Sequence, residues 1–142
     1  MVWEQLRGHA GKAEMFRRSV GRGRLSHAWL FSGPAGTGRR LFAHLLAQCL
    51  FCTEVEDSLL EACGHCHNCR QMQAGSHPDL LEVACPPDKS VLPIESLVGV
   101  TERRGREGLC YELSLRPMSA SRRVAVINDA QLMNPDGANS LL

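Results

Sequence analysis

The sequence predicts an α/β fold with a mostly parallel sheet, because short apolar runs typical of strands alternate with segments of helical periodicity. The apolar run 28–31 leads into a glycine-rich turn over residues 32–38, and apolar residues then recur at helical spacing up to residue 50. A second apolar run, 124–127, consists of strand-forming residues and is expected to be a central strand buried on both faces. These observations define the predicted fold class.

The glycine-rich turn has the spacing of a phosphate-binding loop, and it stands between a predicted strand and a predicted helix. In such a loop, backbone N–H groups and the positive end of the helix dipole converge on an anion. An active loop continues with Lys and then Ser or Thr, whereas Arg39 and Arg40 stand here. Arg39 still offers positive charge as a planar fork, but Arg40 cannot ligate a metal. We therefore expect a degenerate loop without ATP hydrolysis, and the sequence leaves open whether it is empty or holds an anion or a nucleotide. The candidate nucleotide- or anion-binding residues are Gly33, Gly36, Thr37, Gly38 and Arg39.

The residues that follow the apolar run 124–127 also differ from those of an active ATPase. In ATPases with such a loop, a central strand ends with an Asp that holds Mg²⁺. Asn128 occupies that position here, and neutral Asn is a poorer magnesium ligand. Asp129 stands where a Glu that activates water is expected, and its side chain is one methylene shorter. Asn128 and Asp129 therefore form a degenerate Walker B motif, which makes bound ATP and Mg²⁺ doubtful.

The remaining elements are predicted from periodicity and from residues that begin or end helices. After a loop-like lead over residues 1–11, a helix is expected at 12–20, and a strand at 80–84 follows the turn 77–79. A helix begins at Pro93 and continues to Val98, and an interrupted helix is expected from residue 99 to 111. Asn134 is a good N-cap for a helix that begins at Pro135. Because that helix has barely begun at Leu142, we expect a C-terminally truncated domain.

Four cysteines have the spacing of a tetrahedral zinc site. Two knuckle-like pairs share the middle residue of the C-x-x-C-x-x-C run, and a further cysteine precedes them, so the candidate ligands are Cys52, Cys63, Cys66 and Cys69. Cys49 lies one helical turn before Cys52 and is the main rival ligand, while a set of unrelated thiols or an iron–sulfur cluster would also account for the run. Four protein ligands leave no open position for a substrate, so the metal is expected to be structural. Its expected role is to fold the insertion 52–69.

Composition narrows the class of protein only slightly. The 142 residues are 44% hydrophobic and 22% charged, with a formal net charge of +1, which are values typical of a globular chain. The sequence contains neither a signal-peptide pattern nor an apolar stretch long enough to span a membrane, and a cytoplasmic location is the default expectation. Arginines cluster near residues 17–24, 103–106 and 122–123, as solvated surface or as contacts for phosphates or a partner.

Three segments together resemble a known family. The segments are, in chain order, HAWLFSGPAGTG, CGHCHNCRQMQAGSHPDLLEV and VAVINDAQLMNPDGANSLL. The first contains the glycine-rich turn of the degenerate phosphate-binding loop, and the second contains three of the four cysteines of the insertion. This arrangement is similar to the delta-prime subunits of bacterial DNA polymerase III clamp loaders, AAA+ proteins related to the gamma/tau subunits. The resemblance covers nearly the whole chain, and the cysteine insertion running into AGSHPDL is its most specific part.

The resemblance implies that residues 1–142 are an incomplete N-terminal AAA+ domain with a zinc-binding insertion at 52–69. It implies a non-hydrolysing stator of the DNA polymerase III holoenzyme, which helps to load the sliding clamp onto primed DNA in DNA replication. Its partners would be gamma/tau and delta in a hetero-oligomeric ring, with DNA contacted indirectly. The Ser-Arg-Cys motif that carries the family's arginine finger would lie past Leu142, and the segment 99–113 is longer than the usual pattern.

Two competing functions make different predictions. An active gamma/tau-type clamp-loader ATPase would show ATP turnover that depends on Arg39. A zinc-dependent nucleic-acid-binding module would show steeply salt-dependent DNA affinity, against which the near-neutral charge and the few aromatic residues argue.

Overall fold

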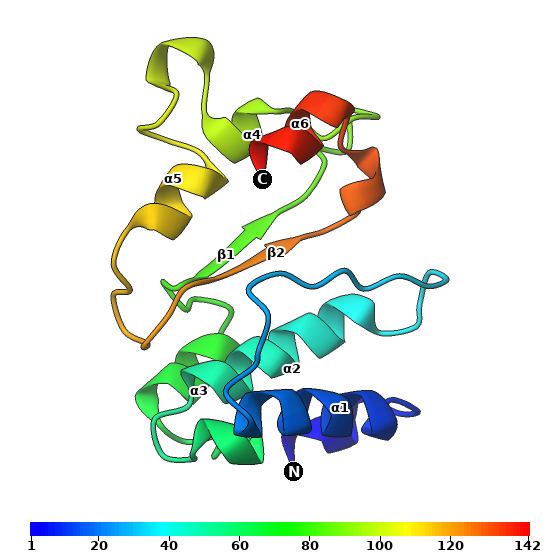
Figure 1. Cartoon of the computed structure of the whole chain (residues 1–142), viewed down its shortest axis with the longest axis vertical. Helices are drawn as coiled ribbons and strands as arrows, with labels where there is room; N and C mark the ends of the chain where they lie inside the picture. The colour runs from blue at the N-terminus through cyan, green and yellow to red at the C-terminus, as the bar shows by residue number, and fades with distance from the viewer. The chain divides into compact units, whose positions relative to one another are not determined.

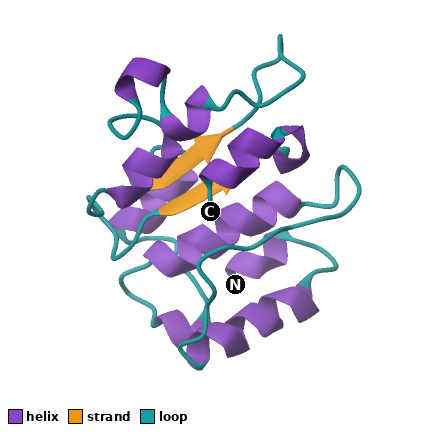
Figure 2. Cartoon of the chain, turned by 45° about the horizontal axis from the view of Figure 1, so that its top comes forward, coloured by secondary structure: helices purple, strands orange, loops and turns teal.

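The computed structural model describes all 142 residues, which divide into two compact units. Unit 1 comprises Met1–His77 and Ser119–Ser121, and unit 2 comprises Pro78–Met118 and Arg122–Leu142. The chain consists of helices and a small sheet of two strands, which the colours of Figure 2 distinguish, so the predicted α/β class is confirmed. None of the helices has both the length and the apolar character that crossing a bilayer requires.

Unit 1 is helical. Its elements are the 3₁₀ helices η1 (Val2–Gln5) and η2 (Asp57–Leu59) and the α-helices α1 (Ala10–Gly21), α2 (Arg39–Phe51) and α3 (His67–Gln73) (Figure 1). The helices expected at 12–20 and after the glycine-rich turn are therefore confirmed as α1 and α2. The lead 1–11 is not simply a loop, because η1 forms within it and α1 already begins at Ala10.

Aromatic side chains form the centre of the unit 1 core. The ring of Phe42 on α2 lies 5.0 Å from the ring of Trp3, 5.5 Å from that of Phe16 on α1 and 5.3 Å from that of Phe31. Phe16 and Phe42 are almost fully buried, so the apolar faces of α1 and α2 meet at these rings. Tilted ring pairs of this kind add to the free energy gained from burial.

The strand predicted before the glycine-rich turn is wrong, since the apolar run 28–31 belongs to neither strand of the structure. The rings of Trp29 and Phe31 lie 4.4 and 6.0 Å from that of Phe16, whereas Leu30 between them is 81% exposed. The run thus keeps the two-residue alternation of an extended chain without being a sheet strand. An apolar run indicates side chains that can pack on a core, whereas a strand also requires a neighbouring backbone that pairs with it.

Unit 2 contains the sheet. Strand β1 (Leu80–Val83) pairs in parallel with β2 (Val124–Ile127), with Leu80 opposite Val124 and Val83 opposite Ile127. Both strands were expected from the sequence, and the parallel pairing is confirmed. The expectation that 124–127 is a central strand buried on both faces is wrong here, because the sheet has two strands and only Val126 in β2 is buried.

The helices of unit 2 are short. They are α4 (Glu95–Val98), η3 (Thr101–Arg103), α5 (Leu109–Ser114), η4 (Ala130–Leu132) and α6 (Pro135–Ser140), and their core is built on Leu92, Leu97 and Leu109. As predicted, Asn134 caps α6, and its Oδ1 accepts a hydrogen bond from the N–H of Gly137 at 2.8 Å. The predicted interruption within 99–111 is also present, because η3 and an irregular loop separate α4 from α5.

A buried ion pair joins the start of β1 to the start of β2. The Arg123 Nε lies 3.5 Å from Oδ1 of Asp79, and the two side chains are 6% and 0% exposed. The same Asp79 oxygen accepts a hydrogen bond from the N–H of Met118 at 2.7 Å, and the Arg123 Nη1 donates to the carbonyl of Glu112 at 2.8 Å. Because both charges have further polar partners, neither is left uncompensated in the interior.

The loop between α4 and α5 closes at a contact between two glycines. Gly108 has φ = +89°, and a Cβ added to it would lie 2.5 Å from the backbone nitrogen of Gly99. Gly105, within the same loop, has φ = +77°, and a Cβ added there would meet nothing within 4 Å. Of Gly105 and Gly108, only Gly108 combines a positive φ with close backbone packing.

We expect Gly108→Ala to lower the free energy of unfolding by about 3 kcal/mol, because the methyl group adds a backbone collision to a left-handed conformation. Gly105→Ala is the matched control and should cost only about 1 kcal/mol, since it changes the conformational preference alone. Denaturant unfolding of the two variants measures the difference. Equal losses would show that the contact between Gly99 and Gly108 does not constrain the loop.

Candidate metal centre

The four cysteines predicted as metal ligands come together in unit 1 from two segments. Cys52 is the C-cap of α2, where the chain leaves the helix in an extended conformation with φ = −60° and ψ = 132°. Cys63, Cys66 and Cys69 belong to the turn before α3 and to its first residues, and Cys66 is the N-cap of that helix. The C-terminal end of one helix and the N-terminal end of another therefore supply all four thiols.

The spacing of the sulfur atoms fits one tetrahedral metal ion. The four Sγ atoms all lie within 4.8 Å of one another, and those of Cys63 and Cys69 are 3.9 Å apart. Zn–S bonds of about 2.3 Å in tetrahedral geometry separate sulfurs by roughly 3.8 Å. Cys52, Cys66 and Cys69 are buried, and Cys63 is half-buried. The cluster can therefore hold a metal ion with small adjustments of its side chains.

Backbone N–H groups point at three of these sulfurs. The N–H of Cys63 donates to Sγ of Cys52 at 3.5 Å, that of Cys66 to Sγ of Cys63 at 3.3 Å, and that of Cys69 to Sγ of Cys66 at 3.4 Å. Such donors favour a thiolate, which is the form that binds metals. The turn therefore orients the sulfurs and also stabilises their charge.

Burial and backbone hydrogen bonds together give two of these thiols different pKa values. Burial would raise the pKa of Cys66, but hydrogen bonds from the backbone of Thr53 and Cys69 outweigh it and lower this pKa to about 6. Burial dominates at Cys69, where the pKa is raised to about 12 in spite of a hydrogen bond from the backbone of Gly64. A cation at the centre would favour the deprotonated form of each ligand.

Cys49, the rival ligand, lies outside the cluster. Its side chain is almost fully buried in the core between the helices, and its Sγ donates to the carbonyl oxygen of Leu60 at 3.4 Å. Burial raises the pKa of this thiol well above its usual range. Cys49 is still within α2, whereas Cys52 has left the helix, and this difference places only Cys52 beside the other three sulfurs.

Asn68 is a structural residue of the site that the sequence did not reveal. It is 2% exposed, and its Nδ2 donates to the carbonyl of Phe51, the last residue of α2, at 2.8 Å. Its Oδ1 accepts a hydrogen bond from the hydroxyl of Ser119 at 2.5 Å. Asn68 thus connects α3 to the end of α2 beside Cys52. The only signal in the sequence is a polar residue between two cysteines, which does not distinguish a buried amide from an exposed one.

In the glycine-rich loop, which is also in unit 1, Thr37 makes two polar contacts. Its Oγ1 donates to the carbonyl of Pro34 at 2.9 Å, and its own carbonyl lies 2.8 Å from Nε2 of His9. Gly38 is the N-cap of α2 with φ = +81°, and Arg39 is the first residue of the helix. Gly33 and Gly36 are exposed, so backbone on this loop is open to solvent.

The predicted second nucleotide motif lies in unit 2, at the end of β2. Nδ2 of Asn128 donates to Oε1 of Glu82 on β1 at 2.6 Å, so a carboxylate of the neighbouring strand holds the Asn128 amide. Asp129 follows in a left-handed conformation with φ = +51° and is the N-cap of η4. The contact with Glu82 was not expected from the sequence, because it depends on the register of the two strands.

The fold and the cysteines define a mixed α/β chain with one candidate metal centre, and comparison with known proteins gives its family. The family model described as DNA polymerase III, delta subunit, matches residues 8–142. The chain therefore belongs to this family, and the resemblance to delta-prime subunits is confirmed.

Individual relatives include both subunit types. The chain is 34% identical to the DNA polymerase III subunit delta' of Bacillus subtilis over 130 residues, which are 91% of this chain and 35% of that protein. It is 33% identical to subunit delta' of Pseudomonas aeruginosa over 141 residues, 99% of this chain and 36% of that protein. It is also 44% identical to subunit tau of Escherichia coli over 121 residues, 84% of this chain and 16% of that protein. The chain thus spans about a third of the length of these delta' relatives.

We expect the purified protein to contain one zinc ion per chain, measured by elemental analysis. Cys69→Ser should lower zinc affinity by more than the roughly 10- to 100-fold typical of losing an outer-shell partner, because a ligand itself is removed. Competition with a chromophoric chelator measures the affinity.

Two control variants test the assignment of the ligands. Cys85→Ser and Cys49→Ala should both retain the metal, since Sγ of Cys85 lies against the carbonyl of Lys89 and Sγ of Cys49 against that of Leu60. Loss of zinc from Cys49→Ala, together with its retention in Cys52→Ala, would replace Cys52 by Cys49 in the ligand set.

Proposed function

We propose that this chain is a non-hydrolysing, stator-type subunit of the DNA polymerase III clamp loader, comparable to delta-prime, with a structural zinc ion on its four clustered cysteines. Within a longer protein it would form the N-terminal AAA+ domain, with residues 52–69 as a zinc-binding insertion. The observation that carries the proposal is the paired departure of two nucleotide motifs from the active pattern, in a chain of this family.

The glycine-rich loop supports the proposal through the two residues that follow it. Arg39 and Arg40 begin α2, at the positions where an active loop has its lysine and hydroxyl. A guanidinium could contact a phosphate, but neither arginine supplies an oxygen ligand for Mg²⁺. The loop therefore keeps an opportunity to bind an anion and lacks the groups that prepare ATP for hydrolysis.

The end of β2 supports the proposal of a non-hydrolysing subunit independently of the glycine-rich loop. Asn128 is neutral, and its amide is already hydrogen-bonded to Glu82. A magnesium ligand at this position would have to be an oxygen that is free to face the ion. Holding the amide nitrogen against a carboxylate favours a structural role for Asn128 within the sheet.

The proposed partners are the gamma/tau and delta subunits in a ring that loads the sliding clamp onto primed DNA. The metal centre would contribute a rigid insertion and no chemistry, because four thiolates fill the tetrahedral coordination of zinc. The hydrolysis of ATP would then belong to gamma/tau subunits.

The second candidate is an active gamma/tau-type ATPase, which the 44% identity to a tau subunit favours. Family membership is common to both candidates, so nucleotide binding has to separate them. A gamma/tau-type chain needs Mg²⁺-dependent binding of ATP in spite of Arg40 and Asn128.

We expect the zinc-loaded protein to bind a fluorescent ATP analogue no better with Mg²⁺ than without it, because Arg40 replaces the hydroxyl ligand of the loop and Asn128 is a poorer magnesium ligand than Asp. The matched variant Arg39→Lys/Arg40→Thr restores the lysine and the hydroxyl. It should gain about tenfold in affinity when Mg²⁺ is present, which corresponds to about 1.4 kcal/mol. Fluorescence titrations with and without Mg²⁺ measure both quantities.

Tight Mg²⁺-dependent binding by the unmodified protein, with turnover that is lost in Arg39→Ala, would contradict the stator proposal and establish the gamma/tau type. The absence of a gain in the double variant would show that Asn128, or its contact with Glu82, is sufficient by itself to prevent magnesium binding.

A further inference from the structure

The segment just before Cys63 forms an arch, defined here as residues 59–61, in which one residue has an unusual backbone conformation. Leu60 has φ = +48° and is fully buried. A non-glycine residue adopts this left-handed conformation only where its surroundings enforce it. The contacts that enforce it therefore identify which residues position the arch.

Two side chains donate to the Leu60 carbonyl oxygen. Nε1 of Trp3 lies 2.8 Å from it and Sγ of Cys49 lies 3.4 Å from it. The Trp3 ring also packs on Phe42 with 5.0 Å between the ring centroids. The tryptophan therefore has an apolar role in the core and a separate polar role at the arch.

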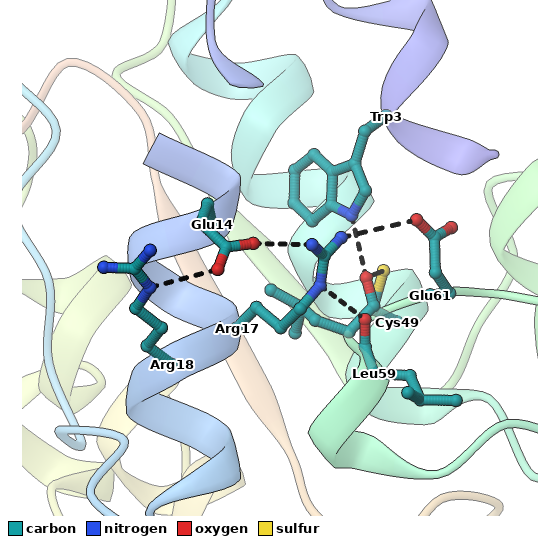
Figure 3. Close-up of polar contacts among 8 residues, drawn as sticks. Trp3, Glu14, Arg17, Arg18, Cys49, Leu59 and Glu61 are labelled. Atoms are coloured by element: carbon teal, nitrogen blue, oxygen red, sulfur yellow. Dashed lines mark hydrogen bonds and ion pairs between the residues drawn. The ribbon is translucent and has the colours of Figure 1, made fainter. Parts of the chain in front are cut away.

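Arg17 on α1 binds the arch on both sides of Leu60. Its Nε donates to the carbonyl of Leu59 at 2.9 Å, and its Nη2 lies 3.7 Å from Oε1 of Glu61 (Figure 3). Its Nη1 donates to Glu14 at 2.6 Å, which fixes the guanidinium from the third direction. A planar fork can make these three contacts together, whereas the single ammonium of a lysine lacks that geometry.

The arch leads directly to the metal ligands. Glu61 is two residues before Cys63, whose N–H donates to Sγ of Cys52 at 3.5 Å. This contact joins the two halves of the cluster, since Cys52 ends α2 and Cys63 begins the turn of the other three ligands. The path of residues 59–61 therefore determines where Cys63 lies relative to Cys52.

We propose that Trp3 and Arg17 are positioning residues for the metal centre, because they hold the arch in the conformation that presents Cys63 to Cys52. The inference rests on the proposed metal site and extends it to the N-terminal segment, which contributes no ligand. Metal binding and the docking of α1 are then coupled, and each stabilises the other by the same factor.

The test compares Arg17→Lys with Arg18→Lys in the 142-residue chain, using Zn²⁺ competition with a chromophoric chelator. Arg18 also pairs with Glu14, at 3.0 Å, but its side chain is 70% exposed, so it is a matched control. Arg17→Lys should lower zinc affinity about tenfold, as is typical for outer-shell partners, and Arg18→Lys should leave it unchanged. Co²⁺, whose absorption reports tetrahedral thiolate coordination, should give the same order of affinities.

The lysine variant distinguishes geometry from charge. If Arg17 acted only through its positive charge on the thiolates, Arg17→Lys would bind zinc like the unmodified protein, and the proposal would be wrong. An unmodified protein without zinc would instead contradict the metal site itself. These two failures are distinguishable, because the second is visible before any variant is made.

Two further variants separate positioning from general stability. Trp3→Phe removes the donor to Leu60 and keeps an aromatic ring beside Phe42. It should therefore also lower zinc affinity severalfold. If Arg17→Lys does not fold, the result for Trp3→Phe decides the question. Lys12→Gly weakens α1 at an exposed position of the helix and leaves the buried core unchanged. Equal loss of zinc affinity in Lys12→Gly would overturn the proposal, because helix stability alone would then explain the effect.

Discussion

The convergence of four sulfurs at the end of α2 is the constraint on which unit 1 depends. Cys52 leaves one helix where Cys66 and Cys69 begin another, so the two helix ends have to meet. Four thiols in so small a volume contribute little as an apolar core, and a metal ion would convert them into a cross-link. The buried amide of Asn68 and the arch before Cys63 both hold the chain in the path that this convergence requires.

The two predicted nucleotide motifs differ in how far they tolerate substitution. A loop of glycines retains its ability to approach an anion after its catalytic residues change, because that ability resides in backbone N–H groups. The magnesium site has no such tolerance, since it requires particular oxygen atoms. Arg40 removes one such ligand, and Asn128 is hydrogen-bonded to Glu82. Under the proposed function, the chain keeps the architecture of a nucleotide-binding domain in a structural role.

Sequence patterns predicted helices more completely than strands. The hydrogen bonds of a helix such as α2 are local, so its periodicity and its start after Gly38 are sufficient to define it. The run 28–31 shows the opposite case, because its apolar residues belong to no sheet, and both Trp29 and Leu30 are exposed. The pairing of β1 with β2 joins residues far apart in the chain, and only the fold decides which apolar runs find such a partner.

The sequence by itself determined the family, the α/β class and the cysteines that are available for a metal, because these follow from local spacing and residue chemistry. Only the tertiary structure decided between Cys49 and Cys52, since the choice depends on where α2 ends. It alone revealed the contacts of Trp3, Arg17 and Asn68, which reach far along the chain. Spacing along a chain limits which atoms can meet locally, whereas contacts between distant residues are fixed by packing of the whole core.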